Sequence, residues 1–232
     1  MKFKTELHCH STVSRCGKVE PEALVEMYVN AGYHTLVLTD HINEQTFSPA
    51  NTRYTGGEDW QEKIDFFLTG YERAKAAAKG RLHVLWAVEV CRAGTRSDFL
   101  VYGLDEQFLR ANPDICEGKD DEFFPRLRKS EAMIFQAHPF RNNITITKPD
   151  LLDGVEVYNA HPRQASRNDF AELWAERFHL RGISGSDLHY AEYAPGGGIL
   201  TDAPITTIEE LLAVLRAGHY ELVREGAPGE DK

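Results

Sequence analysis

Residues 21–41 read PEALVEMYVNAGYHTLVLTDH, and they contain one complete helix-to-strand unit. Pro21 stands where the first turn of a helix accepts proline, apolar residues recur at helical spacing, and Gly32 follows, so residues 21–31 predict an amphipathic helix. Residues 35–39 (TLVLT) are apolar and β-branched, which is typical of a strand buried on both faces. A helix that leads into such a strand is typical of α/β folds with parallel strands.

The same alternation continues in both directions from this unit. Apolar runs predict further strands at residues 3–9, 82–90, 99–104, 132–137, 154–158 and 182–184. Helical patterns cover residues 59–79, 163–179 and 207–217. Residues 111–124 form a polar excursion, that is, a polar segment within the domain rather than a domain boundary. About seven strands without a linker predict a single α/β domain, and they favour a (β/α) barrel over a doubly wound sheet. We assign residues 1–224 to this domain and residues 225–232 to a polar C-terminal tail.

The chain has 232 residues, and 26 Lys and Arg against 36 Asp and Glu give it a formal net charge of −10. This charge disfavours long nucleic acids and anionic membrane surfaces as partners. The first residues, MKFKTELHCH, are charged where a signal peptide is apolar, and no stretch approaches the roughly 18 apolar residues of a membrane span. The four cysteines are too few and too irregular for a disulfide framework. We therefore expect a cytoplasmic protein.

Ten histidines are the unusual feature of the composition, and His8 and His10 both lie at the first predicted strand. Residues two apart on a strand point to the same face, so both imidazoles can reach one metal ion. Asp40 and His41 end the second predicted strand, where α/β folds collect their functional sites. Each pair taken alone also fits an ordinary exposed strand or loop start.

Later strands carry further candidate ligands. Glu89 lies inside the apolar run LWAVEV, where a carboxylate is costly unless a charge or a metal ion compensates it. His138 follows one predicted strand, and Asp187 and His189 follow another in the pattern SDLH. Together these residues predict a metal centre. Imidazole with carboxylate suits Zn, Mn or Fe better than Ca or Mg. The competing interpretation, a cysteine–histidine nucleophile pair, needs only one thiol and one base and so does not account for this many candidate ligands.

The ordered series HCH, TDH, AVEV, AHP and GSDLH resembles the PHP (polymerase and histidinol phosphatase) domain family, in particular its small stand-alone metal-dependent phosphoesterases. The segments DFLVYGL, GVEVYN and TDAPITTIEELLAVLRAG agree with this resemblance, which covers essentially the whole chain. It implies a distorted (β/α)7 TIM-like barrel with two or three divalent metal ions at the C-terminal ends of its strands. It also implies the hydrolysis of phosphate esters.

The ligand positions of the family can be carried over residue by residue. They give a first ion four ligands: His8, His10, Glu89 and Asp187. A second ion shares Glu89 and adds His138, and a third ion is held by His41 and His189.

Two ligand positions of the family have no plain counterpart in this chain. The family has a further ligand shortly after the HxH motif, where this chain has SRCGK. Cys16 is the candidate replacement, because a thiolate binds zinc or iron well. If Cys16 is not a ligand, the third site is weak or empty. His161 is the candidate for a missing ligand of the second ion.

Metal ions lower the pKa of bound water and neutralise the charge that develops on a phosphate. Asp40 and Asp187 are the predicted catalytic carboxylates, which orient that water or a neighbouring histidine. The predicted substrate is a small phosphorylated molecule, so local positive charge must attract it to an acidic protein. Arg15, Arg141 and Arg163 are the candidate substrate-binding residues, although each also fits a solvated surface position.

Three other features have ordinary interpretations. Glu156 is a carboxylate on a predicted strand, and we expect it to pair with an arginine or with backbone rather than with metal. The run PGGG at residues 195–198 predicts a flexible loop that could cover the site, and it lacks the Lys-Ser/Thr of a phosphate-binding loop. Cys9 points away from the HxH face and should be packed.

The sequence favours a phosphoesterase that cleaves a small phosphomonoester or a nucleotide-type phosphodiester with a metal-activated water at a di- or trinuclear site. Histidinol-phosphate phosphatase is the alternative substrate assignment. A non-catalytic metal-binding PHP module is the alternative class, and the SRCGK departure is the one feature that favours it. The sequence leaves the physiological substrate, the metal identity and the oligomeric state open.

Overall fold

A computed structural model describes residues 2–128, 131–226 and 229, so most of the predicted tail at 225–232 lies outside the described residues. The strands are β1 (Phe3–Glu6), β2 (Thr35–Leu38), β3 (His41–Ile42), β4 (His83–Trp86), β5 (Val88–Cys91), β6 (Asp98–Tyr102), β7 (Met133–Gln136), β8 (Gly154–Asn159), β9 (Arg181–Gly185), β10 (Ile199–Thr201) and β11 (Glu221–Leu222). The α-helices are α1 (Pro21–Asn30), α2 (Trp60–Ala78), α3 (Glu106–Ala111), α4 (Asp120–Arg128), α5 (Asn168–Phe178) and α6 (Ile208–Ala217). A 3₁₀ turn covers Pro149–Leu151.

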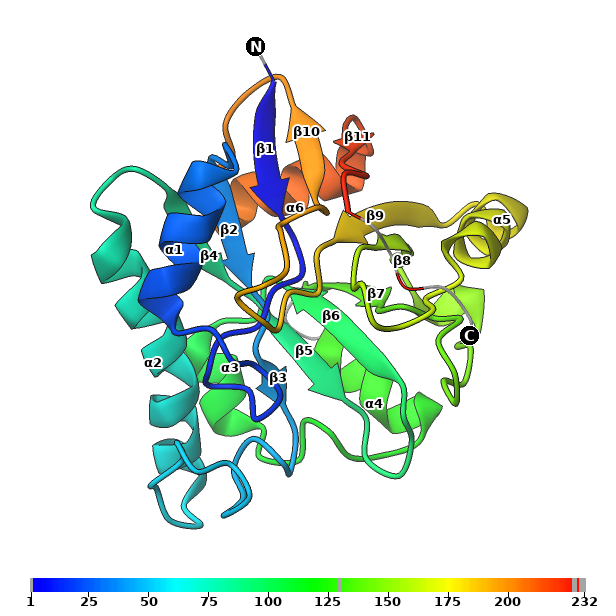
Figure 1. Ribbon diagram of the computed structural model, residues 1–232. Helices are drawn as coiled ribbons and strands as arrows, with labels where there is room; N and C mark the ends of the chain where they lie inside the picture. The colour runs from blue at the N-terminus through cyan, green and yellow to red at the C-terminus, as the bar shows by residue number, and fades with distance from the viewer. Residues whose placement is uncertain (1, 129–130, 227–228, 230–232) are drawn as a thin grey trace.

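These strands form a five-stranded sheet, in the order β11-β10-β1-β2-β4, and a six-stranded sheet, in the order β3-β5-β6-β7-β8-β9 (Figure 1). Two segments run from the first sheet directly into the second, because only two residues separate β2 from β3 and only Ala87 separates β4 from β5. The segments that follow β1 and β9 also pair, since Asp187 N donates to His8 O at 2.8 Å and His10 N donates to Leu188 O at 3.2 Å. Both sheets therefore contribute strand ends to one region.

The predicted parallel arrangement is correct for only part of the sheets. The pairs β1–β2, β2–β4, β3–β5, β7–β8 and β8–β9 are parallel. In contrast, β6 runs antiparallel to β5 and β7, because a short turn after Cys91 returns the chain directly to Asp98. The run at 82–90 was predicted as one strand and is two, since β4 and β5 belong to different sheets.

The helix predictions are confirmed where caps and amphipathic spacing coincide. Asp59 caps α2 by accepting from two backbone N–H groups, and Thr207 forms a capping box with Glu210 at the start of α6. The predicted helix at 163–179 is shorter, because α5 begins only at Asn168. The predicted polar excursion at 111–124 was wrong in part, since α4 begins within it and buries Phe123, Phe124 and Leu127 beneath an acidic first turn.

Three clusters of buried apolar side chains hold the helices and sheets together. Cys9 is fully buried in one of them, as predicted for the residue between the two histidines of the HxH motif. Among the described helices, none combines the length and the apolar character that crossing a membrane requires. Closure of the two sheets into a barrel stays a prediction.

Candidate metal centre

The two histidines of the HxH motif lie side by side directly after β1. Their Nε2 atoms are 3.1 Å apart, and both side chains are fully buried. The sequence alternation therefore places both imidazoles on one face, as predicted.

Glu89, on β5, lies at the centre of the histidine cluster. Its Oε2 atom is 3.3 Å from His8 Nε2 and 3.1 Å from His10 Nε2. The same atom is 3.1 Å from His41 Nδ1, and Oε1 is 3.3 Å from His138 Nε2. Neither oxygen has a hydrogen-bond partner within the described part of the chain, although the carboxylate is buried. Four imidazoles thus surround a carboxylate that lacks any directed donor.

Asp187 enters the same cluster from the segment after β9. Its Oδ1 atom lies 3.4 Å from both His8 Nε2 and His10 Nε2, and 3.3 Å from His189 Nδ1. Its Oδ2 atom accepts from Arg141 Nη2 at 2.8 Å. One oxygen therefore faces the imidazoles, while the other is fixed by an arginine.

The backbone is strained at two of these positions. His138 has a φ of +31° and Asp187 a φ of +48°, in the left-handed region that side chains other than glycine rarely adopt. Strain of this kind costs on the order of 1–3 kcal/mol and concentrates at functional sites. It aims both side chains into the cluster.

Three groups of donor atoms lie close enough together to hold an ion, each within 4.8 Å. They are His10, His41 and His189; His8, His10 and Asp187; and His8, Glu89 and His138. The groups share members, as expected for neighbouring ions. The buried Glu89 carboxylate without a hydrogen-bond donor is the observation that fits a cation at this place, because an uncompensated buried charge is costly. The mixture of imidazole and carboxylate suits Zn, Mn or Fe.

The protonation states of His41, His189, Glu89 and Asp187 suit a cation, whereas the raised pKa values of His8 and His10 mean that a cation must displace their protons. Burial, followed by the positive charge of His10, lowers the pKa of His189 to about 3, and burial dominates in lowering that of His41 to about 4. Burial also disfavours the charged form of His10, but the Asp187 and Glu89 carboxylates, 3.4 Å and 3.1 Å from its Nε2 atom, outweigh it and raise its pKa to about 9. Despite burial, the neighbouring histidines hold the pKa values of Glu89 and Asp187 well below their usual range.

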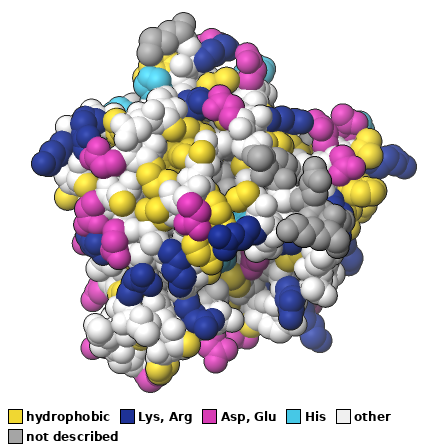
Figure 2. Space-filling view, in the orientation of Figure 1, with side chains coloured by type: hydrophobic (Ala, Val, Ile, Leu, Met, Phe, Trp, Pro, Cys, Tyr) yellow, Lys and Arg dark blue, Asp and Glu magenta, His cyan; other side chains and the backbone are white. Residues whose placement is uncertain are grey.

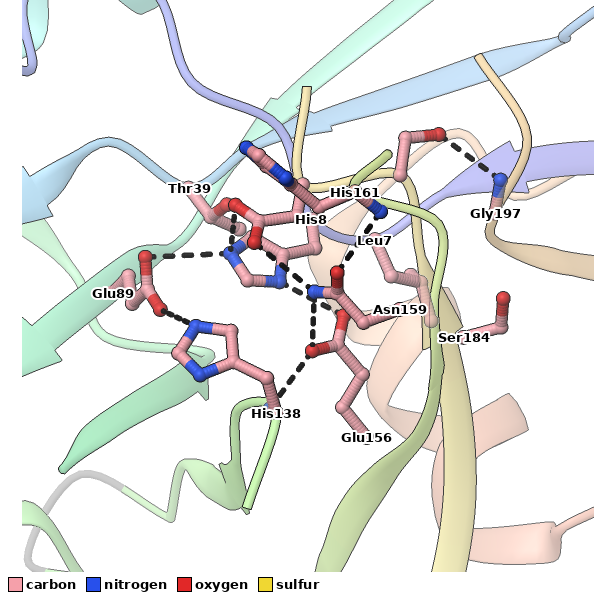
Figure 3. A network of polar contacts seen from close by, with 12 residues as sticks. Leu7, His8, Thr39, Glu89, His138, Glu156, Asn159, His161, Ser184 and Gly197 are labelled. Atoms are coloured by element: carbon pink, nitrogen blue, oxygen red, sulfur yellow. Dashed lines mark hydrogen bonds and ion pairs between the residues drawn. The ribbon is translucent and has the colours of Figure 1, made fainter. Parts of the chain in front are cut away.

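Glu156, on β8, supports this cluster from behind (Figure 3). Its Oε1 atom lies 2.8 Å from His8 Nδ1, and its Oε2 atom accepts from His138 N and Asn159 Nδ2, each at 2.9 Å. Asn159 Nδ2 also lies 3.1 Å from Asp187 Oδ2. The prediction that Glu156 pairs with backbone is confirmed, and its contact with His8 was not foreseen.

Asp40 lies beside the cluster rather than in it. Its two oxygens accept from the backbone N–H and the hydroxyl of both Ser11 and Ser14, at 2.6–3.2 Å. The Ser14 hydroxyl in turn accepts from His41 N at 2.9 Å and lies 3.4 Å from His10 Nδ1. Asp40 therefore fixes two candidate ligands through Ser14, and its own oxygens are fully engaged.

The candidates for the missing ligands lie in different places. Cys16 lines a pocket beside His41 and belongs to none of the three groups; burial, followed by the charge of Glu89, raises the pKa of its thiol well above the usual value. The ring of His161 lies 5.5 Å from that of His189, so it approaches the histidines of the other candidate ion.

Asp98 lies beside the candidate metal centre, and the sequence analysis missed it. Its Oδ2 atom lies 4.0 Å from His138 Nε2, and burial, followed by repulsion from Glu89, raises its pKa to about 6. Asp98 begins β6, and this strand is antiparallel to β5, so its first residue lies where the parallel strands end. A search confined to the C-terminal ends of parallel strands could not find it; the carboxylate that opens the apolar run DFLVY was the available signal.

The three arginines predicted to bind substrate have different surroundings. Arg141 donates to Asp187, Asn159 and Ser166, so it orients a candidate ligand. Arg163 is exposed, pairs with a glutamate and stacks over Tyr190. Of these three arginines, only Arg15 lines the pocket beside the cluster.

That pocket has a volume of about 810 Å³, and its lining includes His41, Cys91 and Asp98 from the edge of the cluster. Figure 2 shows Lys and Arg side chains gathered in the lower half of this face of the molecule. The run PGGG, predicted as a mobile cover, is instead packed, since Gly196–Gly198 are buried and their N–H groups donate to Ser184 and Ser186.

Comparison with known proteins places this arrangement among known folds. The family model of the PHP domain matches residues 6–220. A curated but uncharacterized protein of Methanocaldococcus jannaschii is 26% identical over 199 residues, which cover 81% of this chain and 66% of that protein. This chain thus spans about two-thirds of the length of that relative.

Solved structures share the fold at low sequence identity. A two-domain protein of Bacteroides vulgatus, described as containing a predicted PHP-like metal-dependent phosphoesterase, has a TM-score of 0.70 at 18% identity and covers 97% of this chain and 65% of its own. An amidohydrolase of Chromobacterium violaceum has a TM-score of 0.56 at 19% identity, with coverage of 95% and 98%. Endonuclease Q, solved with duplex DNA that carries an abasic lesion, has a TM-score of 0.63 at 13% identity, with coverage of 95% and 58%.

Proposed function

The chain belongs to the PHP domain family, and on this premise we propose that it is a metal-dependent phosphoesterase. The proposed reaction is hydrolysis of a small phosphomonoester or a nucleotide-type phosphodiester at a centre of two or three divalent ions. The observation that carries the proposal is the Glu89 carboxylate, which is buried, has no hydrogen-bond donor among the described residues and is surrounded by four imidazoles.

The side chains of the cluster divide into ligands and residues that hold them. The proposed ligands are His8, His10, His41, Glu89, His138, Asp187 and His189. When bound, divalent ions supply a water of lowered pKa and neutralise negative charge on a phosphate. We propose Asp98 as an additional ligand on the side of His138, in the position for which His161 was first considered.

The remaining residues of the site hold the ligands in place. Glu156 fixes the ring of His8, and Arg141 fixes the carboxylate of Asp187. Asp40 acts on His10 and His41 through Ser14, so we propose that it positions ligands and does not itself exchange a proton with substrate. Residues of this kind commonly change metal affinity by about 10–100-fold when they are replaced.

We also propose that the two sheets are parts of one distorted (β/α)7 TIM-like barrel. The two hydrogen bonds between the segments that follow β1 and β9 support this closure, as does the direct passage of β2 into β3 and of β4 into β5. In such barrels the site lies at the C-terminal ends of the strands, where the candidate ligands of this chain also lie.

Three alternatives follow from the same family. Histidinol-phosphate phosphatase is a narrower substrate assignment within the proposed chemistry. A DNA substrate would follow the example of endonuclease Q, but the net charge of −10 favours a small substrate. A non-catalytic metal-binding module would keep the ligands without turnover.

The test combines metal content with activity. We expect purified protein to hold at least one equivalent of Zn, Mn or Fe by elemental analysis and to hydrolyse small phosphate esters, with loss of both in Glu89→Gln and Asp187→Ala. His219→Ala is the matched control, because this exposed histidine lies outside the cluster. A panel of histidinol phosphate, nucleotides and duplex DNA distinguishes the substrates. Less than one metal per chain, or equal activity in Asp187→Ala, would overturn the proposal, and metal without turnover would favour the non-catalytic module.

A further inference from the structure

The pocket beside the candidate metal centre is much larger than one phosphate group requires. Its volume of about 810 Å³ lies within the range of roughly 300–1,000 Å³ that is usual for small-molecule sites. His41 and Asp98 connect it to the cluster, and Arg15 and Lys18 line it from the loop after β1. The pocket therefore has room for the leaving group of an ester as well as for the phosphate.

Arg15 and Lys18 differ from the other basic residues of this pocket because their partners are all neutral. The guanidinium of Arg15 donates to Gln45 Oε1 at 2.9 Å and to Ala50 O at 3.4 Å. The ammonium of Lys18 donates to Arg15 O at 2.9 Å. No carboxylate of the described residues pairs with either cation, so both retain their charge for a ligand.

The two other arginines of the pocket each lie near a carboxylate. Arg53 Nε lies 3.8 Å from Glu20 Oε1, and Arg92 Nη1 lies 2.6 Å from Asp120 Oδ1. Glu20 and Asp120 do not line the pocket, so they hold these guanidinium groups from outside it. The free positive charge of the pocket is thus concentrated on one loop.

That loop is fixed to the metal centre by its backbone. Lys18 N donates to His189 O at 2.8 Å, and Ser14 N donates to Asp40 Oδ1 at 3.2 Å. Thr12 N also donates to Val19 O at 3.0 Å, which closes the base of the loop. Because the backbone of the loop is held before a ligand arrives, binding by its two cations requires little ordering of that backbone.

We propose, on the premise of the phosphoesterase function, that Arg15 and Lys18 bind a second anionic group of the substrate. The substrate class is then a phosphate ester whose leaving group carries a carboxylate or a phosphate at its far end. A guanidinium matches either group with paired hydrogen bonds, and the neighbouring ammonium adds a point charge. Exposed Glu44 and Glu117 line the same pocket and repel a longer polyanion, which limits the substrate to a compact molecule.

The test uses matched series of esters with the metal-loaded protein. Alkyl phosphates of increasing length are compared with esters of the same length that end in carboxylate or in a second phosphate. We expect KM to be about tenfold or more lower for the doubly anionic esters at the best length, and the Arg15→Gln/Lys18→Gln protein to lose this preference. The control Arg53→Gln should keep both this preference and the kcat and KM for plain alkyl phosphates. The better of the two end groups identifies the second anion.

A binding measurement separates this inference from the proposed function. Calorimetry with alkyl phosphonates, with and without a terminal carboxylate or phosphonate, reports the subsite without turnover. A preference in binding that Arg15→Gln/Lys18→Gln abolishes, in a protein that hydrolyses no ester, supports the subsite and overturns the catalytic function. Hydrolysis with no preference for a second charge, or an equal loss of preference in the control Arg53→Gln, overturns the subsite.

Discussion

His8 Nδ1 lies 2.8 Å from Glu156 Oε1, and neither side chain is exposed to solvent. The other ring nitrogen of His8 faces Glu89 and Asp187. A carboxylate that accepts from one nitrogen of an imidazole fixes the tautomer in which the other nitrogen offers its lone pair. Glu156 therefore fixes which ring nitrogen of His8 is free to bind a cation.

Glu156→Gln should weaken this arrangement on one of its two sides. Glu156 Oε1 faces His8 Nδ1 and Oε2 faces two N–H donors, so the amide group of glutamine must oppose a donor on one side. An unsatisfied buried group costs about 1–3 kcal/mol, and we expect metal affinity to fall by about 10–100-fold. Chelator competition and urea denaturation measure the two effects. Glu172→Gln, which removes an exposed pair with Arg224, should change stability by less than about 1 kcal/mol.

Asp40→Asn separates a positioning role from a catalytic one. The amide nitrogen of Asp40→Asn would face the Ser11 hydroxyl if it replaced Oδ2, and three donors if it replaced Oδ1. We therefore expect a loss of about 1–3 kcal/mol in the free energy of unfolding together with weaker metal binding. A catalytic base would instead lower kcat at saturating metal and leave stability intact. Unchanged stability with reduced kcat would contradict the positioning role.

The sequence predicted much of the site because local rules govern it. His8 and His10 share a face through strand alternation, and Glu89 is conspicuous as a charge inside an apolar strand, so neither inference needs the direction of any other strand. The helices with good caps, such as α6, were found for the same reason.

The parts that were missed depend on contacts between distant segments. Asp98 joins the site only because β6 is antiparallel, and Arg141 meets Asp187 from 46 positions away along the chain. The run PGGG was predicted to be mobile from its composition, yet it is held by two serine hydroxyls of β9 and the residue after it. Composition describes what a segment can do alone, and tertiary contacts determine which option it takes.

Gly197→Ala should be destabilising, which would contradict a role as a mobile cover. A Cβ at Gly197 would lie 2.0 Å from the carbonyl carbon of Gly185 and 2.4 Å from Ser186 N, so backbone must move. We expect a loss of about 2 kcal/mol or more in the free energy of unfolding, measured by urea denaturation. Gly32→Ala, where φ is +75° and nothing lies within 4 Å, controls for the left-handed backbone alone and should cost about 1 kcal/mol. Equal costs at both positions would mean that the segment around Gly197 shifts to accommodate the added methyl group.

Metal affinity should rise with pH because a cation must displace the proton of His10. Burial opposes that proton, but Asp187 and Glu89 raise the pKa of His10 from 6.5 to about 9. A group with a raised pKa stabilises the metal-free fold fully below its unfolded pKa, and this stabilisation is lost as the pH rises from 6.5 through about 9. Over the same window we expect the affinity for Mn²⁺ to increase by at least about tenfold per pH unit, because His8, whose pKa the neighbouring carboxylates raise despite its burial, must lose its proton too. Chelator competition measures the affinity, and urea denaturation of metal-free protein measures the opposite trend in stability. His219→Ala should reproduce both slopes, and an affinity that is flat across this window would show that His10 is already unprotonated before the metal binds.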